Sequence, residues 1–139
     1  MIYLDASALV KLVIEEPETS QLRTAVSGRA DIVSSLISRV ELARALQRVT
    51  AAGRVSSRQL QVLRERAEQA FARLGLLPID DQVVRLAQSV EPTSLRSLDA
   101  IHLATALSIG TVEAVITYDN RLAKASVRNG LSVLSPGQA

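Results

Sequence analysis

Short apolar segments alternate with longer segments of helical periodicity along the whole 139-residue chain. The apolar segments have the length and composition of buried strands. We predict strands at residues 2–4, 32–35, 76–79, 114–117 and 131–134. Because helices separate successive strands, the connections imply parallel strands, and a parallel sheet is covered by helices on both faces. The sequence therefore predicts an α/β fold with a parallel β-sheet flanked by helices on both faces.

Polar N-cap residues and following glycines mark the ends of the predicted helices. Pro78 indicates an edge strand or the start of a strand. We predict helices at 6–15, 18–27, 38–52, 56 or 57–74, 80–90, 97 or 98–108 and 119–129. The chain has no internal repeat and no Pro/Gly-rich linker, so residues 1–139 are expected to form a single domain.

The composition excludes several kinds of chemistry. The chain has no Cys, so disulfides, thiolate zinc sites and a cysteine nucleophile are excluded. His102 is the one histidine, so zinc sites built on two or three histidines are excluded as well. If the protein is an enzyme, carboxylates must do most of the chemistry.

The formal net charge of +2 hides a basic segment in the middle of the chain. Residues 39–73 hold eight arginines against three glutamates, a net charge of +5. An anionic partner such as nucleic acid explains this excess, and so does a solvated helix surface in an arginine-rich chain. The first residues lack a basic targeting segment and no apolar run is long enough to span a membrane, so we expect a cytoplasmic protein without membrane contact.

Asp5 and Asp119 each follow an apolar strand and precede a helix. Both positions suit an ordinary N-cap, which is the alternative to a functional role. Ser7 and Thr117 lie two residues from these acids, so their hydroxyls are placed to orient a carboxylate or to cap the local backbone.

Asp99 and Glu41 lie in the first turns of two other predicted helices. The alternative for Asp99 is favourable charge at a helix start, with Ser97 as the cap. Glu41 is placed to form a capping box with Ser38, or to point inward as a site residue.

In a parallel sheet, all four of these acids belong to the same edge, where open α/β sheets place their sites. Clustered carboxylates repel one another, and a fold keeps them when a cation neutralises them. Oxygen ligands without Cys favour a hard ion, Mg²⁺ or Mn²⁺, which serves phosphodiester hydrolysis by activating water.

Four segments of the sequence resemble the PIN-domain ribonucleases, and most closely the VapC toxins of type II toxin–antitoxin pairs. They are residues 1–9 (MIYLDASAL), the segment around Glu41, residues 98–106 (LDAIHLATA) and residues 116–122 (ITYDNRL). The resemblance spans essentially the whole chain. It implies a PIN-like three-layer fold and a Mg²⁺- or Mn²⁺-dependent endoribonuclease whose cleavage of RNA arrests growth.

The same resemblance implies roles for single residues. It places Asp5, Glu41, Asp99 and Asp119 in the acidic catalytic and metal site, with Asp5 and Asp99 as direct metal ligands. Glu41 and Asp119 bind the metal directly, bind it through water, or position the nucleophile. In the family, Ser7 and Thr117 correspond to supporting polar residues. His102 is read as structural, since the family does not use it as a general base.

The resemblance also implies partners. It predicts a VapB-type antitoxin, an RNA substrate and a homodimer. The apolar faces of residues 38–52 and 56–74 would form a groove for the antitoxin, or else pack in the core or a dimer seam. Two other functions stay open: a non-catalytic PIN-like module that binds RNA or protein, and, less in keeping with the acid pattern, a phosphoaspartyl receiver domain.

Overall fold

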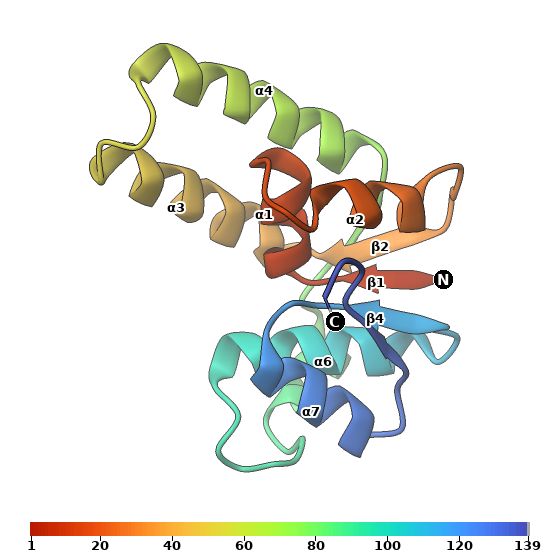
Figure 1. Ribbon diagram of the computed structural model, residues 1–139. Helices are drawn as coiled ribbons and strands as arrows, with labels where there is room; N and C mark the ends of the chain where they lie inside the picture. The colour runs from red at the N-terminus through yellow and green to blue at the C-terminus, as the bar shows by residue number, and fades with distance from the viewer. Residues whose placement is uncertain (139) are drawn as a thin grey trace.

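The computed structural model describes residues 1–138, which form a parallel five-stranded sheet with helices on both faces (Figure 1). The order of the strands across the sheet is β3-β2-β1-β4-β5. Leu4 of the central strand pairs in register with Ile116 of β4. The strands are β1 (Ile2–Leu4), β2 (Ile32–Ser35), β3 (Gly75–Leu77), β4 (Ala114–Ile116) and β5 (Val133–Leu134). The predicted α/β fold is therefore confirmed.

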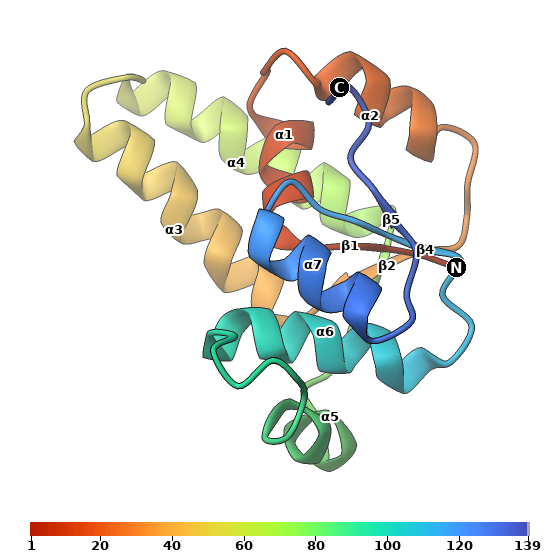
Figure 2. The same cartoon turned by 60° about the horizontal axis from the view of Figure 1, so that its bottom comes forward.

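Seven helices occur among the described residues, and their sequence order matches the prediction. Helices α1 to α4 lie over one face of the sheet, and α5 to α7 over the other (Figures 1 and 2). The helices are α1 (Ala6–Val13), α2 (Thr19–Val26), α3 (Ile37–Ala51), α4 (Ser57–Ala72), α5 (Asp81–Ala87), α6 (Ser97–Ile109) and α7 (Asn120–Arg128).

The alternation of side chains along β1 divides the core between the two faces. Ile2 and Leu4 pack with α1 to α4 in the larger apolar cluster. Tyr3 points to the opposite face, where it packs near Ala106 of α6. Because this strand is buried on both faces, each of its three residues is apolar or aromatic.

Helices α3 and α4 form a hairpin that extends beyond the carboxyl ends of the strands (Figure 1). Ser56 starts α4 with a capping box, because its hydroxyl accepts from the Gln59 amide while the Gln59 side chain accepts from Ser56 N–H. Leu63 and Phe71 of α4 pack into the core. The eight arginines of residues 39–73 are all exposed.

Three predicted strands are displaced or shorter than expected: β4 ends at Ile116, one residue early, and β3 and β5 differ for local reasons. β3 ends at Leu77, because Pro78 has no N–H with which to continue the ladder. β5 begins only at Val133, since Leu131 N–H still bonds to Ser126 O at the end of α7. Among residues 1–138, no helix has both the length and the hydropathy of a membrane span.

Candidate acidic site

The strand order reverses between β1 and β4, which are neighbours although far apart in sequence. Such a reversal opens a crevice at the carboxyl ends of the strands. Asp5 directly follows β1, and Asp119 lies three residues beyond the end of β4. Glu41 and Asp99 lie near the starts of α3 and α6, so the predicted residues all belong to this edge of the sheet.

Asp5 is buried, with 4% of its surface exposed. Its Oδ1 accepts hydrogen bonds from the Ser7 hydroxyl at 2.6 Å and from the Ala8 N–H at 3.1 Å, and its Oδ2 accepts from the Thr117 hydroxyl at 2.6 Å. Burial raises the pKa of Asp5, although these hydrogen bonds oppose the shift. No Lys or Arg within residues 1–138 forms an ion pair with it.

The two hydroxyls that hold Asp5 are themselves oriented by the backbone. Ser7 Oγ accepts from the Tyr118 N–H at 2.9 Å, and Thr117 Oγ1 accepts from the Asp119 N–H at 3.0 Å. Each hydroxyl oxygen thus accepts one hydrogen bond from the backbone and donates its own O–H to Asp5. The expected contacts by which Ser7 and Thr117 orient the Asp5 carboxylate are therefore present. A role of these two residues in catalysis stays a prediction.

Asp99 is half-buried in the first turn of α6. Its pKa is raised first by burial and next by the charge of Asp119, with smaller contributions from Asp5 and Glu41, and the nearby His102 opposes the shift. Asp99 is thus close enough to the other three predicted acids for their charges to raise its pKa. The helix starts at Ser97, one of the two predicted positions, so Ser97 is not its cap; the N-cap is Arg96, whose side chain makes no capping hydrogen bond.

Glu41 does not form the capping box that was one of its two predicted roles. Ser38 is buried, and its hydroxyl bonds to the Ser34 hydroxyl at 2.7 Å, so it is not available to cap α3. The Glu41 side chain instead contacts His102, with Oε1 lying 2.6 Å from Nε2. The contact with His102 uses Oε1 only, so Oε2 of Glu41 does not take part in it.

His102 and Tyr3 are the neighbours of the site that sequence reasoning did not connect to it. His102 is 2% exposed, and its Nδ1 lies 2.7 Å from the Tyr3 hydroxyl. Burial, followed by the charge of Asp5, raises the pKa of Tyr3. The available signal was a phenol in the otherwise apolar strand β1 and the one histidine of the chain, in α6.

Asp119 is both the N-cap of α7 and a member of the acidic group. Its Oδ1 accepts from the N–H groups of Arg121 at 2.8 Å and Leu122 at 3.2 Å. Asp5 similarly caps α1 through Ala8. The capping and site interpretations are therefore compatible, since one carboxylate oxygen is sufficient for the cap.

The donor chemistry of this edge fits a hard divalent cation. All four acids offer carboxylate oxygens, which Mg²⁺ and Mn²⁺ prefer. Within residues 1–138, no three His, Asp or Glu side chains already converge as a metal-binding group. The residues that could hold a cation at this edge are the buried Asp5 and the half-buried Glu41, Asp99 and Asp119.

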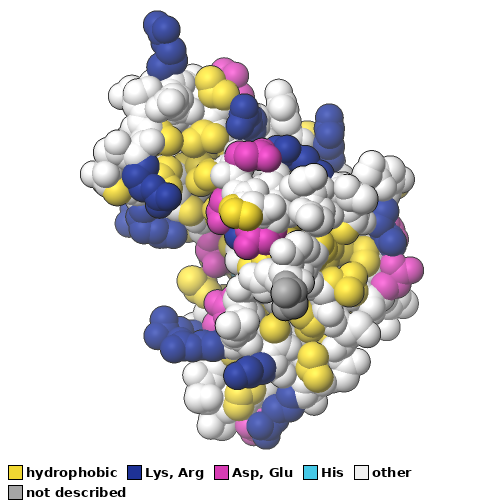
Figure 3. Space-filling model, in the orientation of Figure 1, with side chains coloured by type: hydrophobic (Ala, Val, Ile, Leu, Met, Phe, Trp, Pro, Cys, Tyr) yellow, Lys and Arg dark blue, Asp and Glu magenta, His cyan; other side chains and the backbone are white. Residues whose placement is uncertain are grey.

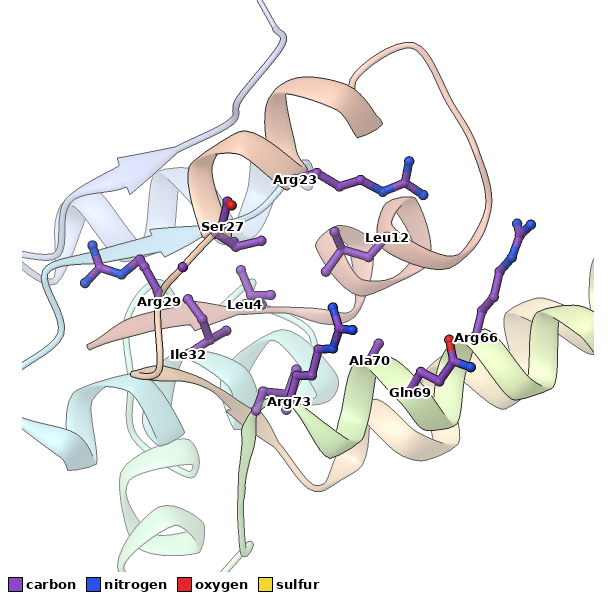
Figure 4. A pocket seen from close by; sticks show the side chains of 13 residues that line it. Leu4, Leu12, Arg23, Ser27, Arg29, Ile32, Arg66, Gln69, Ala70 and Arg73 are labelled. Atoms are coloured by element: carbon purple, nitrogen blue, oxygen red, sulfur yellow. The ribbon is translucent and has the colours of Figure 1, made fainter.

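Two grooves adjoin helix α4, away from the acids. The first lies between α1 and the α3–α4 hairpin, has a volume of about 820 Å³, and is lined by Val10, Ile14, Val49 and Leu63 among others. Figure 3 shows apolar side chains gathered on this hairpin, with Lys and Arg around them. The second lies between α2 and α4, where Arg73 reaches over an apolar floor (Figure 4).

Comparisons with known proteins agree with this geometry. Residues 2–127 match the family model of the PIN domain. Over 142 aligned residues, the chain is 43% identical to Ribonuclease VapC47 of Mycobacterium tuberculosis, covering 99% of this chain and 98% of that protein. A second relative, Ribonuclease VapC46 of the same species, is 40% identical and covers 97% of each chain.

A solved structure shows the same fold at lower identity. FitAcB from Neisseria gonorrhoeae superposes with a TM-score of 0.74 at 22% identity and covers 100% of both chains. The fold, the order of the acids and the full-length relatives define a PIN domain. The chain belongs to this family, and within it to the VapC ribonucleases.

Proposed function

We propose that the chain is a metal-dependent endoribonuclease and the toxin of a VapBC-type pair. The observation that carries this proposal is Asp5, a buried carboxylate without a Lys or Arg partner in residues 1–138, at the sheet edge to which three half-buried acids also belong. Burying a carboxylate without a counter-charge destabilises a fold. A bound cation would supply the missing counter-charge and remove this destabilisation.

Asp5 and Asp99 would hold Mg²⁺ or Mn²⁺, with Glu41 and Asp119 beside them or acting through water. When bound, such an ion polarises the phosphoryl oxygen, lowers the pKa of water and stabilises the leaving oxygen. Asp5 is suited to holding the ion because both of its oxygens are fixed by hydrogen bonds. Asp119 caps α7 through Oδ1, and its Oδ2 takes no part in this cap.

The exposed arginines of the α3–α4 hairpin supply a surface for RNA phosphates next to this edge. With one Phe and two Tyr in the chain, base stacking contributes little. Binding of RNA should therefore weaken steeply with salt, as phosphate contacts release counterions.

Cleavage of structured RNA by the purified chain in Mn²⁺ tests the activity. Wild type should produce defined fragments, and Asp5→Asn and Asp99→Asn should not. Asp31→Asn, at the opposite edge of the sheet, is the matched control and should cut like wild type. RNA binding without cleavage in any divalent metal would favour the non-catalytic binding module instead.

An antitoxin is the proposed protein partner. A solved relative of this fold is described as a toxin–antitoxin complex from Klebsiella pneumoniae, with a TM-score of 0.65, 21% identity and 98% of each chain covered. We propose that an apolar antitoxin segment occupies the groove between α1 and the hairpin, because Val10, Ile14 and Val49 line it.

The product of the neighbouring reading frame provides the test of this contact. Val49→Asp should abolish its complex with the chain, and Val127→Asp, an exposed position on α7, should not. A complex that survives Val49→Asp would place the partner elsewhere.

A homodimer is the proposed state of the chain alone. Leu36 and Val40 are exposed, at 47% and 56%, near the start of α3. A second copy that covered them would remove this apolar surface from water. Sedimentation of wild type and of Val40→Glu tests this: the variant should sediment as a monomer, and an unchanged dimer would refute the proposed seam.

A further inference from the structure

Three side chains from three different elements form a continuous line from the core to the acidic site. The Tyr3 hydroxyl of β1 lies 2.7 Å from His102 Nδ1, and His102 Nε2 of α6 lies 2.6 Å from Glu41 Oε1 of α3. Tyr3 is fully buried and His102 is 2% exposed, while Glu41 is half-buried at the site. The polar atoms of this line are separated in sequence by 99 and 61 residues.

The chemistry of the groups sets the direction of the contacts. An ionised carboxylate only accepts hydrogen bonds, so we assign a proton to His102 Nε2, which donates a hydrogen bond to Glu41 Oε1. The Tyr3 hydroxyl keeps its proton at neutral pH, because burial and the charge of Asp5 raise its pKa, and it therefore has an O–H for Nδ1. The ring of Tyr3 also packs edge-on against the imidazole, with the centroids 5.9 Å apart.

We propose that His102 is a positioning residue for Glu41, and that Tyr3 fixes the orientation of the His102 ring. The proposal rests on the proposed function, since it assigns Glu41 to the metal site. His102 holds one oxygen of Glu41 and leaves the other to face the cation or its water. The role lies outside the four acids, and His102 itself does not touch substrate or metal.

A purely structural histidine does not require this arrangement. His102 lies among apolar neighbours such as Leu103, and an apolar side chain of similar size would satisfy packing without a buried polar ring. The polar ring becomes useful because it lies between Tyr3 and Glu41. Partners that orient metal ligands commonly change metal affinity or activity by about 10- to 100-fold when removed.

A double-mutant cycle measured as Mn²⁺ affinity, by calorimetry on the full chain, tests the role. His102→Leu should weaken Mn²⁺ binding by about 10-fold in the wild-type background and not at all in a Glu41→Ala background. His102→Gln, which keeps a donor near the place of Nε2, should restore binding. Leu103→Ala is the matched control, because it opens a cavity in the same helix without touching Glu41, and it should leave the affinity unchanged.

The contact between His102 and Glu41 can also be measured without metal. Since His102 is the one histidine of the chain, ¹⁵N NMR of the imidazole gives one unambiguous pair of ring signals. Nε2 should be protonated, and its signal should move in Glu41→Ala, whereas Tyr3→Phe should mainly move Nδ1. An unprotonated Nε2, or a ring that does not respond to Glu41→Ala, would overturn the contact.

The outcomes separate this inference from the proposed function. If wild type binds Mn²⁺ and cuts RNA while His102→Leu weakens Mn²⁺ equally with and without Glu41, the positioning role is refuted and the nuclease stands. If wild type binds no Mn²⁺, or Asp5→Asn binds it as well as wild type, the metal site itself is refuted, and the role of His102 falls with it.

Discussion

At the amino edge of the sheet, Asp31 and Glu113 pair with Arg29, and Asp31 also lies 3.4 Å from the amino terminus. At the carboxyl edge, Asp5 and Asp99 have no Lys or Arg partner within residues 1–138. The two groups of acids are held by the same parallel strands and their connections. They differ in whether the chain itself provides the opposite charge.

The pKa values follow this difference. Arg29 lowers the pKa of Asp31 to about 2. Burial raises the pKa of Asp5, and burial together with neighbouring acids raises that of Asp99. The amino edge therefore neutralises its acids with a charge from the chain, whereas the acids of the carboxyl edge lack such a charge, which the proposed cation would supply.

The largest expected effect is loss of RNA cleavage on neutralising the carboxyl edge. Asp5→Asn and Asp99→Asn should each lower the rate in Mn²⁺ by at least about 100-fold, because several kcal/mol of transition-state stabilisation depend on the ion. Asn keeps the N-cap at position 5, so circular dichroism should show an intact fold. Equal cleavage rates in wild type and both variants would show that the acids at the carboxyl edge are not needed for cleavage.

A smaller loss is expected from the hydroxyls that hold Asp5. Ser7→Ala and Thr117→Val each remove one hydrogen bond to this carboxylate and should reduce kcat by about 10-fold. RNA affinity should stay the same, since neither hydroxyl faces the arginines of the hairpin. A change confined to KM would show that these residues contact substrate rather than orient Asp5.

Added metal should stabilise only a chain with an intact carboxyl edge. At a free Mn²⁺ concentration of about 10 times Kd, binding adds about 1.4 kcal/mol to the free energy of unfolding, which raises Tm by several degrees. Calorimetry of Asp5→Asn should show no rise, and chelation should remove it from wild type. A similar rise in Asp5→Asn would indicate that the metal binds elsewhere.

The smallest effects are on stability without metal, and they have opposite signs at the two edges. Because the folded pKa of Asp5 is raised, ionisation at neutral pH destabilises the fold, and Asp5→Asn should raise Tm at pH 7 but not below the ordinary Asp pKa. Asp31→Asn should lower Tm slightly at pH 7, since its stabilising contribution is lost only as pH falls toward about 2. Shifts of the same sign in both variants would contradict the comparison.

The sequence predicted the order of the elements because each short strand is apolar throughout and each helix has a readable end. It also predicted the edge that carries Asp5 and Asp119, since both follow parallel strands. It did not predict the contact of Glu41 with His102, which depends on how α3 and α6 pack across the sheet. The capping box of Ser38 failed for the same reason, because its buried partner Ser34 comes from the sheet.

Local rules also misjudged where some elements end. The helix predicted at 6–15 stops at Val13, and the extended backbone of Ile14 leads into a turn closed by Thr19, whose hydroxyl bonds to the Lys11 carbonyl. Such a contact joins residues beyond one helical turn, so periodicity does not reveal it.

The double use of Asp5 and Asp119, as helix caps and as members of the acidic group, has a genetic consequence. A single-base transition converts an Asp codon to an Asn codon, and Asn supports the start of a helix as well as Asp does. If these two acids serve the proposed cleavage of RNA, the coding sequence lies one base change from a protein that folds, presents its grooves to a partner and does not cut RNA. A population under selection by its own toxin would then have a route of escape at two separate codons.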